Sequence, residues 1–319
     1  MSSPRALTGL AFATLLLIAF MMGANHVAAR LAFNHGTNVA AAVVFRSLVT
    51  ALVVGGIVYW QRVPVVFTPR HKRFLPLIGL LIGVQSLCLY SAVARLPVAL
   101  ALLAFNTYPL WAALWDRVFY KRSPERVVLM TMPIILIGLA MALDVFGAAS
   151  GLGASGQWQK IGEGVAFAVA AGATFGLAMV LTQHEAAALD GRVRTLTTLS
   201  LAALVAMVSA SLQGGLKFPG DSFGWGGLFA LTFLYGTAFT IMLSVLPKLG
   251  VAGNSAIMNV EPVFALILAW LILGQSIATV QVAGALLVVG AVLGLGLRKG
   301  RAQPQGAKAM SLKSTPPIN

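Results

Sequence analysis

The sequence predicts an all-α polytopic membrane protein, with ten transmembrane helices arranged as two inverted five-helix repeats and both termini in the cytoplasm. Three observations lead to this fold class. The 319-residue chain is 59% hydrophobic and only 9% charged, whereas a soluble domain usually carries about 25% charged residues. Apolar runs long enough to cross a hydrocarbon core of about 30 Å recur along the chain. The second half also repeats the residue pattern of the first.

Ten apolar segments are expected to cross the membrane, separated by polar connectors rich in Gly, Pro and Asn. The first is predicted to be a retained span, because no clear signal-peptide cleavage site follows its apolar run. Beyond the last span, residues 299–319 are polar and without periodicity, which predicts a disordered cytoplasmic tail. The predicted spans are 7–29, 38–60, 74–94, 98–119, 127–147, 161–182, 195–213, 224–246, 250–273 and 278–297.

The basic residues orient these spans. Seventeen of the 22 Lys and Arg residues fall on the side that holds the N-terminus, four fall on the other side, and Arg46 lies within a span. An excess of Lys and Arg marks cytoplasmic loops, so both termini are expected inside the cell. The same loops account for the net charge of +14, and nucleic-acid binding is not expected.

A shift of 153 residues aligns the two halves of the chain. It places "ARLPVALALLAFNTYPLWAAL" (94–114) on "PKLGVAGNSAIMNVEPVFALI" (247–267). One offset that serves three spans predicts two repeats, residues 1–150 and 151–298. The coinciding residues are Asn106 with Asn259, Tyr108-Pro109 with Glu261-Pro262, Gly9 with Gly162, Gly23 with Gly176, Gly83 with Gly236 and Ser91 with Ser244.

Each repeat holds five spans, an odd number, so the second repeat enters the membrane from the side opposite to the first. Inverted repeats of this kind are typical of secondary transporters, whose substrate site lies near the membrane midplane between the halves.

Three stretches of the chain also resemble a known family. "MNVEPVFALILAWLILGQSIATVQVAGALLVVGAVLGL" resembles the end of the second repeat in EamA-type members of the drug/metabolite transporter superfamily. "MMGANHVAARLAF" resembles their first span, and "AVARLPVALALLAFNTYPLWAAL" resembles their hairpin of spans three and four. The resemblance implies a ten-span carrier of the bacterial inner membrane that exports amino acids or other small metabolites. Where the family often has Leu-Gly-Glu after span nine, this chain has Gln275.

Glu261 is the acidic residue placed closest to the midplane, about 16 Å into the ninth span at 1.5 Å per residue. An ionisable residue inside a span is a functional candidate by default. Glu261 is expected to bind a substrate ammonium or to carry a coupling proton; a fixed ion pair or hydrogen bond to a neighbouring helix is the structural alternative.

Proline follows Glu261 and its counterpart in the first repeat. Pro109 and Pro262 predict hinges, because each removes a helical hydrogen bond and displaces a carbonyl group. Asn106 and Asn259 are placed either to satisfy these carbonyls or to face a ligand. A simple packing kink is the alternative.

Arg46 is the one basic residue well inside a span. Arg46 is expected to pair either with an acidic side chain, for which Glu261 is a candidate in one state, or with a substrate carboxylate. Asn25 and His26, near the outer end of span one, are placed either in an interface or in a proton relay. The remaining candidates for the cavity wall are Gln85, Tyr90, Tyr108, Trp111 and Tyr235.

These features predict a secondary active transporter that alternates access between its two repeats. Its expected partners are a small-molecule substrate and the lipid bilayer. Proton coupling is left open, and glycines such as Gly284 and Gly290 serve either packing or a homodimer. The sequence shows no ATP-binding loop and predicts no metal or cofactor. The alternative is an integral membrane enzyme acting on lipid-like substrates, which usually needs clustered acids or histidines near an interface.

Overall fold

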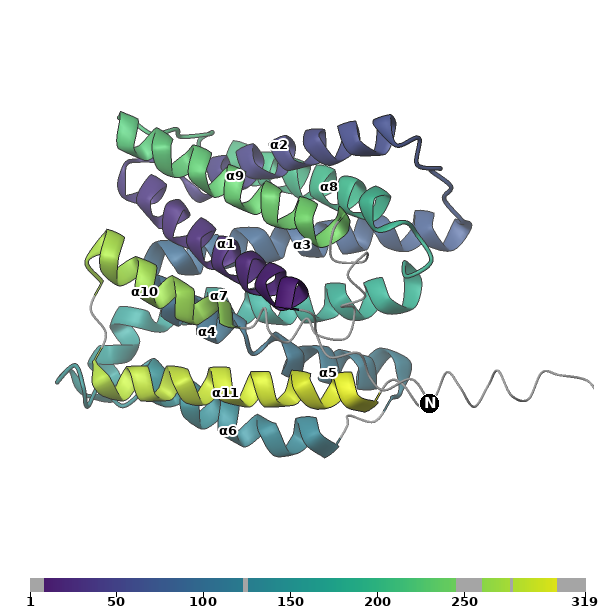
Figure 1. Ribbon diagram of the computed structural model, residues 1–319. Helices are drawn as coiled ribbons and strands as arrows, with labels where there is room; N and C mark the ends of the chain where they lie inside the picture. Colours follow the sequence, from purple (N-terminus) through teal and green to yellow (C-terminus); the bar gives the residue numbers. More distant parts are fainter. Residues whose placement is uncertain (1–8, 123–125, 245–259, 276–277, 303–319) are drawn as a thin grey trace, which may run out of the picture.

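A computed structural model of the protein describes residues 9–122, 126–244, 260–275 and 278–302. These residues form eleven helices and no strand (Figure 1). The helices are α1 (Gly9–Asn34), α2 (Val39–Trp60), α3 (Pro69–Arg95), α4 (Val98–Phe105), α5 (Tyr108–Tyr120), α6 (Arg126–Ala142), α7 (Gly153–Glu185), α8 (Gly191–Leu212), α9 (Ser222–Ser244), α10 (Glu261–Leu273) and α11 (Thr279–Ala302).

The described residues contain seven apolar segments long enough to cross a membrane. Three shorter apolar helices, Met132–Ala142, Glu261–Leu273 and Thr279–Ala291, fall within the predicted fifth, ninth and tenth spans. Large apolar side chains face outwards, among them Trp60 (86% exposed) and Leu212 (82% exposed). The predicted all-helical class is confirmed, and the chain is a multi-pass membrane protein. The first part of the predicted ninth span lies outside the described residues.

Two helices begin at least five residues earlier than predicted. Helix α3 starts at Pro69 rather than residue 74, because Thr68 caps it by accepting the N–H of His71 at 3.2 Å, and proline suits the first helical turn. Helix α7 starts at Gly153 rather than residue 161. It follows a tight turn in which the Asp144 carboxylate accepts two backbone N–H groups, at 3.0 and 2.8 Å.

Two helices end five residues later than predicted. Helix α1 continues to Asn34 rather than residue 29. Within this extension Arg30 donates to the carbonyl oxygens of Val93 and Leu96, at 2.6 and 3.3 Å, where α3 ends. The arginine thereby satisfies carbonyl groups that have no partner within their own helix. Helix α11 continues to Ala302, and the rest of the predicted tail, residues 303–319, lies outside the described residues.

The predicted fourth span is interrupted in its middle. Helix α4 ends at Phe105 and α5 begins at Tyr108, with Thr107 N–H donating to Ala104 O at 3.3 Å between them. Pro109 lies in the first turn of α5, where its missing N–H has no helical partner to lose. Pro262 has the same position in α10. Pro109 therefore starts a helix rather than bending a continuous one.

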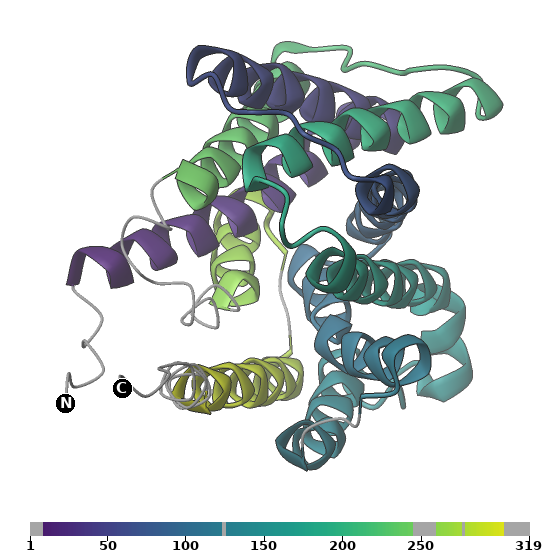
Figure 2. The same ribbon diagram turned by 90° about the vertical axis from the view of Figure 1, so that its right-hand side faces the viewer.

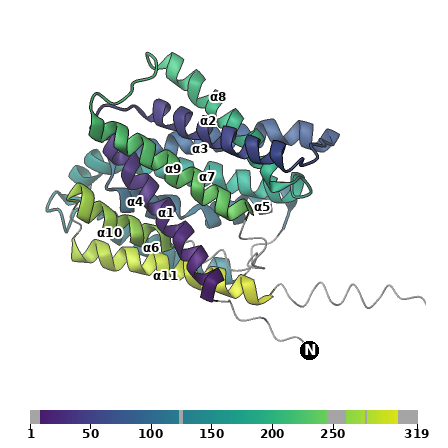
Figure 3. The ribbon, with the colours of Figure 1, turned by 45° about the horizontal axis from the view of Figure 1, so that its top comes forward.

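The helices of the two halves pack in reciprocal pairs. Helix α1 contacts α9 and α10, and its counterpart α7 contacts α3 and α5. Helix α2 packs on α8, and α6 packs on α11, at opposite sides of the bundle (Figure 2). Figure 3 shows α1 crossing α9 and α10. Helices α1 and α7 run in opposite directions along the bundle (Figure 1).

Two of the close contacts between the halves occur at glycines that the sequence shift pairs. A Cβ on Gly23 would lie 2.9 Å from Glu261 O and 3.1 Å from Ala265 N. A Cβ on Gly176 would lie 3.0 Å from Tyr108 O and 2.8 Å from Ala112 N. Each residue of the second set lies 153 positions from its counterpart in the first set. The sequence repeat is therefore also a repeat of packing, with each half supplying the glycine for one contact.

The loop between α7 and α8 carries a titratable helix cap. The Asp190 carboxylate accepts the N–H of Arg192 at 2.8 Å and pairs with its guanidinium at 2.7 Å. The side-chain hydrogen bond from Arg192, helped by backbone N–H groups, lowers the pKa of Asp190 to about 2. A carboxyl group whose pKa is lowered by folding stabilises the protein fully above its unfolded pKa and loses that contribution as the pH falls.

We expect Asp190→Ala to lower the free energy of unfolding at pH 7 by about 1 kcal/mol, because the cap is lost. The difference from the wild type is expected to shrink as the pH falls from about 4 towards 2, where wild-type Asp190 takes up its proton. Thermal unfolding of both purified proteins across this range measures the effect. A difference that stays constant down to pH 2 contradicts the ionic contribution.

Candidate functional site

Two sets of polar side chains lie inside the bundle, and the first is the Glu261–His26 pair. His26 Nε2 lies 3.3 Å from Glu261 Oε1, and the histidine is only 4% exposed. Glu261 begins α10, so its charge faces the favourable N-terminal end of the helix dipole. His26 lies three residues after Gly23, on the same face of α1. The close approach of α10 to α1 at Gly23 therefore brings the carboxylate and the imidazole together.

Tyr90 of α3 lies beside this pair. Its ring contacts the His26 ring edge-on, with centroids 5.6 Å apart. Its hydroxyl donates to Asn25 Oδ1 at 2.9 Å, and the Asn25 amide in turn donates to the Met22 carbonyl. Tyr90 is fully buried. These contacts fix the ring against α1, next to the Glu261–His26 pair.

The second polar group is the Arg46 cluster, which consists of Arg46, Ser86, Gln85 and the rings of Tyr90 and Tyr235. The guanidinium carbon lies 4.7 Å from the Tyr90 centroid and 4.0 Å from the Tyr235 centroid. Arg46 Nη2 donates to Ser86 Oγ at 2.8 Å, and Ser86 donates to Gln85 Oε1 at 3.3 Å. The cluster joins α2, α3 and α9, about 10 Å along α2 from its start. Cation–π contacts with two buried rings are therefore the main partners of this charge.

Three buried polar atoms on α2 lack hydrogen-bond partners among the described residues. They are Arg46 Nε, Ser47 Oγ and Thr50 Oγ1. A buried donor without a partner costs about 1–3 kcal/mol. Arg46 is 4% exposed, and it forms no ion pair with any carboxylate in the described part of the chain. Pairing of Arg46 with Glu261 is thus not seen; Glu261 contacts His26 instead.

The structure brings together seven of the predicted site residues and places three others elsewhere. Asn106 donates to Leu102 O at 2.9 Å, within its own segment, and this is not the carbonyl that Pro109 was expected to displace, that of Phe105. Trp111 stacks near Trp115, and Tyr108 lies in an aromatic cluster with Phe105 and Phe175. Asn259 lies outside the described residues. The seven that lie together are Asn25, His26, Arg46, Gln85, Tyr90, Tyr235 and Glu261.

Sequence reasoning missed the hydroxyl groups around Arg46. Ser47 and Thr50 follow it by one and four residues on the same predicted helix, and Ser86 follows the candidate Gln85. The four-residue spacing of Arg46 and Thr50 could have indicated that they are neighbours, because residues four apart on a helix lie on the same face. Serine and threonine in a span are nevertheless common, because they can donate to carbonyl groups of their own helix.

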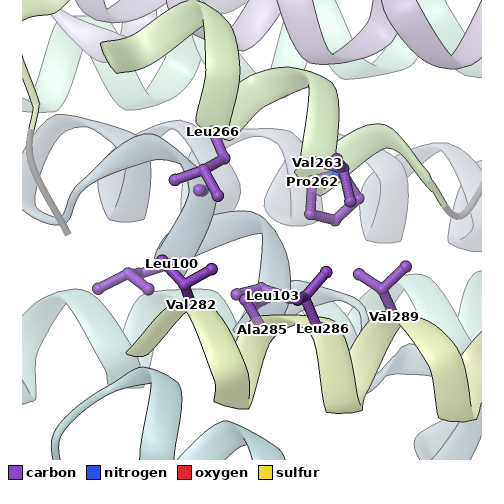
Figure 4. A pocket seen from close by; sticks show the side chains of 10 residues that line it. Leu100, Leu103, Pro262, Val263, Leu266, Val282, Ala285, Leu286 and Val289 are labelled. Atoms are coloured by element: carbon purple, nitrogen blue, oxygen red, sulfur yellow. The ribbon is translucent and has the colours of Figure 1, made fainter. Parts of the chain in front are cut away.

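A small cavity lies between α4, α10 and α11 (Figure 4). Its volume is about 30 Å³, which suits one water molecule by size, but its walls are all apolar and do not favour one. Helices α4 and α10 both contribute to it, and Pro262 forms part of its wall. The lining lacks Glu261 and Arg46 and does not suit a polar substrate. The wall residues are Ala99, Leu100, Leu103, Pro262, Val263, Leu266, Val282, Ala285, Leu286 and Val289.

Polar contacts join helices of the two halves at both ends of the bundle. At the end where α3 begins, Arg70 pairs with Glu185 of α7, and Tyr120 of α5 donates to the same carboxylate at 2.5 Å. A cavity of about 430 Å³ beside this pair is lined by Pro69, Arg70, Arg73, Phe74 and Glu185.

At the opposite end, Arg95 of α3 pairs with Glu163 of α7 at 2.8 Å. Here the Gln275 side chain accepts the N–H of Val98 at 3.0 Å, so the neutral residue links the end of α10 to the start of α4. Among the described residues, no group of three or more His, Cys, Asp or Glu side chains is arranged to hold a metal ion.

Comparisons with known proteins describe the same repeat. The model of the EamA-like transporter family matches residues 9–143 and 162–297, two ranges that begin 153 residues apart. Sixteen solved chains match. One of them, described only as "Crystal structure of protein", is 17% identical, with a TM-score of 0.57 and coverage of 92% of this chain and 99% of its own. This similarity shows the fold. No curated protein matches the chain.

Proposed function

Because the chain belongs to the EamA-like transporter family, we propose that it is a secondary active transporter that exports amino acids or related small polar metabolites across the bacterial inner membrane. The observation that carries this proposal is the Glu261–His26 pair. A carboxylate at the start of α10 contacts an imidazole that is only 4% exposed, on a helix of the other half. Such a pair can bind a substrate ammonium and can carry a proton, because a carboxylate and an imidazole each have a neutral and a charged form.

The proposed mechanism is alternating access between the two repeats. Helix α1 of the first half packs on α10 of the second, and α7 of the second packs on α5 of the first. When Glu261 binds a proton or a substrate ammonium, its attraction to His26 changes, and with it the free energy of the α1–α10 contact. The contacts between the two halves then open at one end of the bundle at a time.

The proposed topology has ten spans with both termini in the cytoplasm. The distribution of Lys and Arg residues supports it. The start of α1 and the end of α11 also lie at the same end of the bundle (Figure 1). In this orientation the Arg70–Glu185 pair faces the cytoplasm. The division of the chain at residue 150 stays a prediction, and homodimer formation is left open.

A flux screen in reconstituted vesicles tests the proposed function. Labelled amino acids and small polar amines are loaded one at a time, with and without a pH gradient across the membrane. Saturable efflux of at least one compound, faster when the gradient is imposed, is the expected result. Correctly folded protein that moves no compound faster than protein-free vesicles contradicts the proposed substrate class. Flux that ignores the gradient indicates facilitated diffusion and removes proton coupling.

A further inference from the structure

We infer that the Arg46 cluster, together with Ser47 and Thr50, is an anion-binding subsite that takes a carboxylate of the transported molecule. This subsite is separate from the Glu261–His26 pair. The inference rests on the proposed function and narrows it: the substrates are dipolar molecules whose carboxylate is read by Arg46, and simple amines are excluded.

The first argument is the position of the guanidinium. The rings of Tyr90 and Tyr235 lie 4.7 and 4.0 Å from the guanidinium carbon, and Arg46 Nη2 donates to Ser86 Oγ. A guanidinium carries five N–H donors and can pair with a carboxylate in a two-point geometry. The two rings therefore hold the charge in place, while Arg46 Nε still lacks a partner among the described residues.

The second argument is the set of unpaired donors. Arg46 Nε, Ser47 Oγ and Thr50 Oγ1 are all buried without a partner among the described residues. Buried polar groups in proteins nearly always have hydrogen-bond partners, so each exception calls for an explanation, of which a bound ligand is one. Thr50 lies one helical turn after Arg46, on the same face of α2. A carboxylate has about four acceptor positions, enough to accept from both Arg46 Nε and Thr50 Oγ1.

The third argument is charge. Arg46 is 4% exposed and has no carboxylate partner in the described part of the chain. A buried charge without a counter-ion is unfavourable, and a substrate anion supplies the missing charge. Tyr90 touches both Arg46 and His26. One molecule can therefore place its cationic end at Glu261 and its anionic end at Arg46, with Tyr90 between them. Because Arg46 is covered, the molecule enters only when α2, α3 and α9 separate.

The inference is tested by binding of matched ligands to the purified full-length protein. The probes are the twenty L-amino acids, followed for each that binds by its carboxamide and its decarboxylated amine. Affinity is measured by titration calorimetry in the wild type, Arg46→Gln, Arg46→Lys and Thr50→Val. We expect the wild type to bind the acid at least about tenfold more tightly than the amide. This ratio is expected to fall to about twofold or less in Arg46→Gln and to an intermediate value in Arg46→Lys.

The contrary outcomes are set by the same ratio. Thr50→Val keeps the shape of the side chain but removes its hydroxyl group, so it is expected to weaken binding of the acid and to lower the acid-to-amide ratio. If Arg46→Gln does not fold, the acid-to-amide ratios of the wild type and of Thr50→Val still test the inference. Equal binding of acid and amide by the wild type, an unchanged ratio in both Arg46→Gln and Thr50→Val, or no binding of any amino acid overturns the inference. Vesicle flux of amines that lack a carboxylate overturns it too, yet leaves the proposed transport intact.

Discussion

Vesicles that contain the Glu261→Gln variant are expected to show no substrate flux above protein-free vesicles, although the variant folds. Glutamine keeps the size of the side chain but cannot carry a proton or neutralise an ammonium group. The Glu261–His26 contact at 3.3 Å also loses its ionic character. Because the variant can neither carry the proton nor bind the ammonium group, we expect the initial rate of flux to fall at least about 100-fold, as when a charge-stabilising group is removed from an active site. Initial rates in the same vesicles with and without a pH gradient measure it.

Glu163→Gln is the matched control for this loss. Glu163 is also a glutamate paired with a cationic side chain between the two halves, but its side chain is 69% exposed. An exposed pair of this kind contributes about 0–1 kcal/mol, so the control is expected to fold and transport nearly as the wild type does. His26→Gln is expected to retain binding of an ammonium substrate and to lose the dependence on the pH gradient. Wild-type flux from Glu261→Gln contradicts the central role given to this carboxylate.

Much of the fold follows from local sequence. Length and composition identify the apolar helices, and Pro109 marks the point where α4 gives way to α5. The repeat shift gave one long-range result: it pairs Gly23 with Gly176, and both glycines lie at the same contact in opposite halves. The starts of α3 and α7 differ from those predicted. At α3, the Thr68 cap extends the helix beyond its apolar run.

The contacts of the site could not be predicted from the sequence. His26 and Glu261 lie 235 residues apart along the chain, and no local pattern sets which face of α1 meets α10. In a helix of a soluble protein, the polar face marks the side exposed to water, so the opposite face is the buried one. A helix surrounded by lipid is apolar on most faces, so its sequence does not show which face is buried in the bundle. The rotation of α2 that places Arg46 between Tyr90 and Tyr235 depends on packing between helices, which only the structure shows.

Alanine at either of the paired glycines is expected to destabilise the protein to a similar degree. Each new Cβ would lie 2.8–3.0 Å from a backbone atom of the facing helix, and backbone yields less readily than a side-chain tip. Overpacking of this kind typically costs about 1–3 kcal/mol. Gly56→Ala is the matched control, because a Cβ there meets nothing within 4 Å. Thermal unfolding of Gly23→Ala, Gly176→Ala and Gly56→Ala in detergent measures the three effects.

The two destabilised variants are expected to differ in transport. Gly23→Ala pushes the start of α10 away from α1, at the place where Glu261 meets His26, so flux per folded molecule is expected to fall about tenfold or more. Gly176→Ala disturbs the equivalent contact in the other half, which holds the ring of Tyr108 and no carboxylate. Its flux per folded molecule is expected to stay within about threefold of the wild type, because its damage is mainly to packing. Equal loss of flux in both variants contradicts the assignment of the polar site to one half. If both variants keep wild-type flux per folded molecule, the close approach at Gly23 does not set the Glu261–His26 contact.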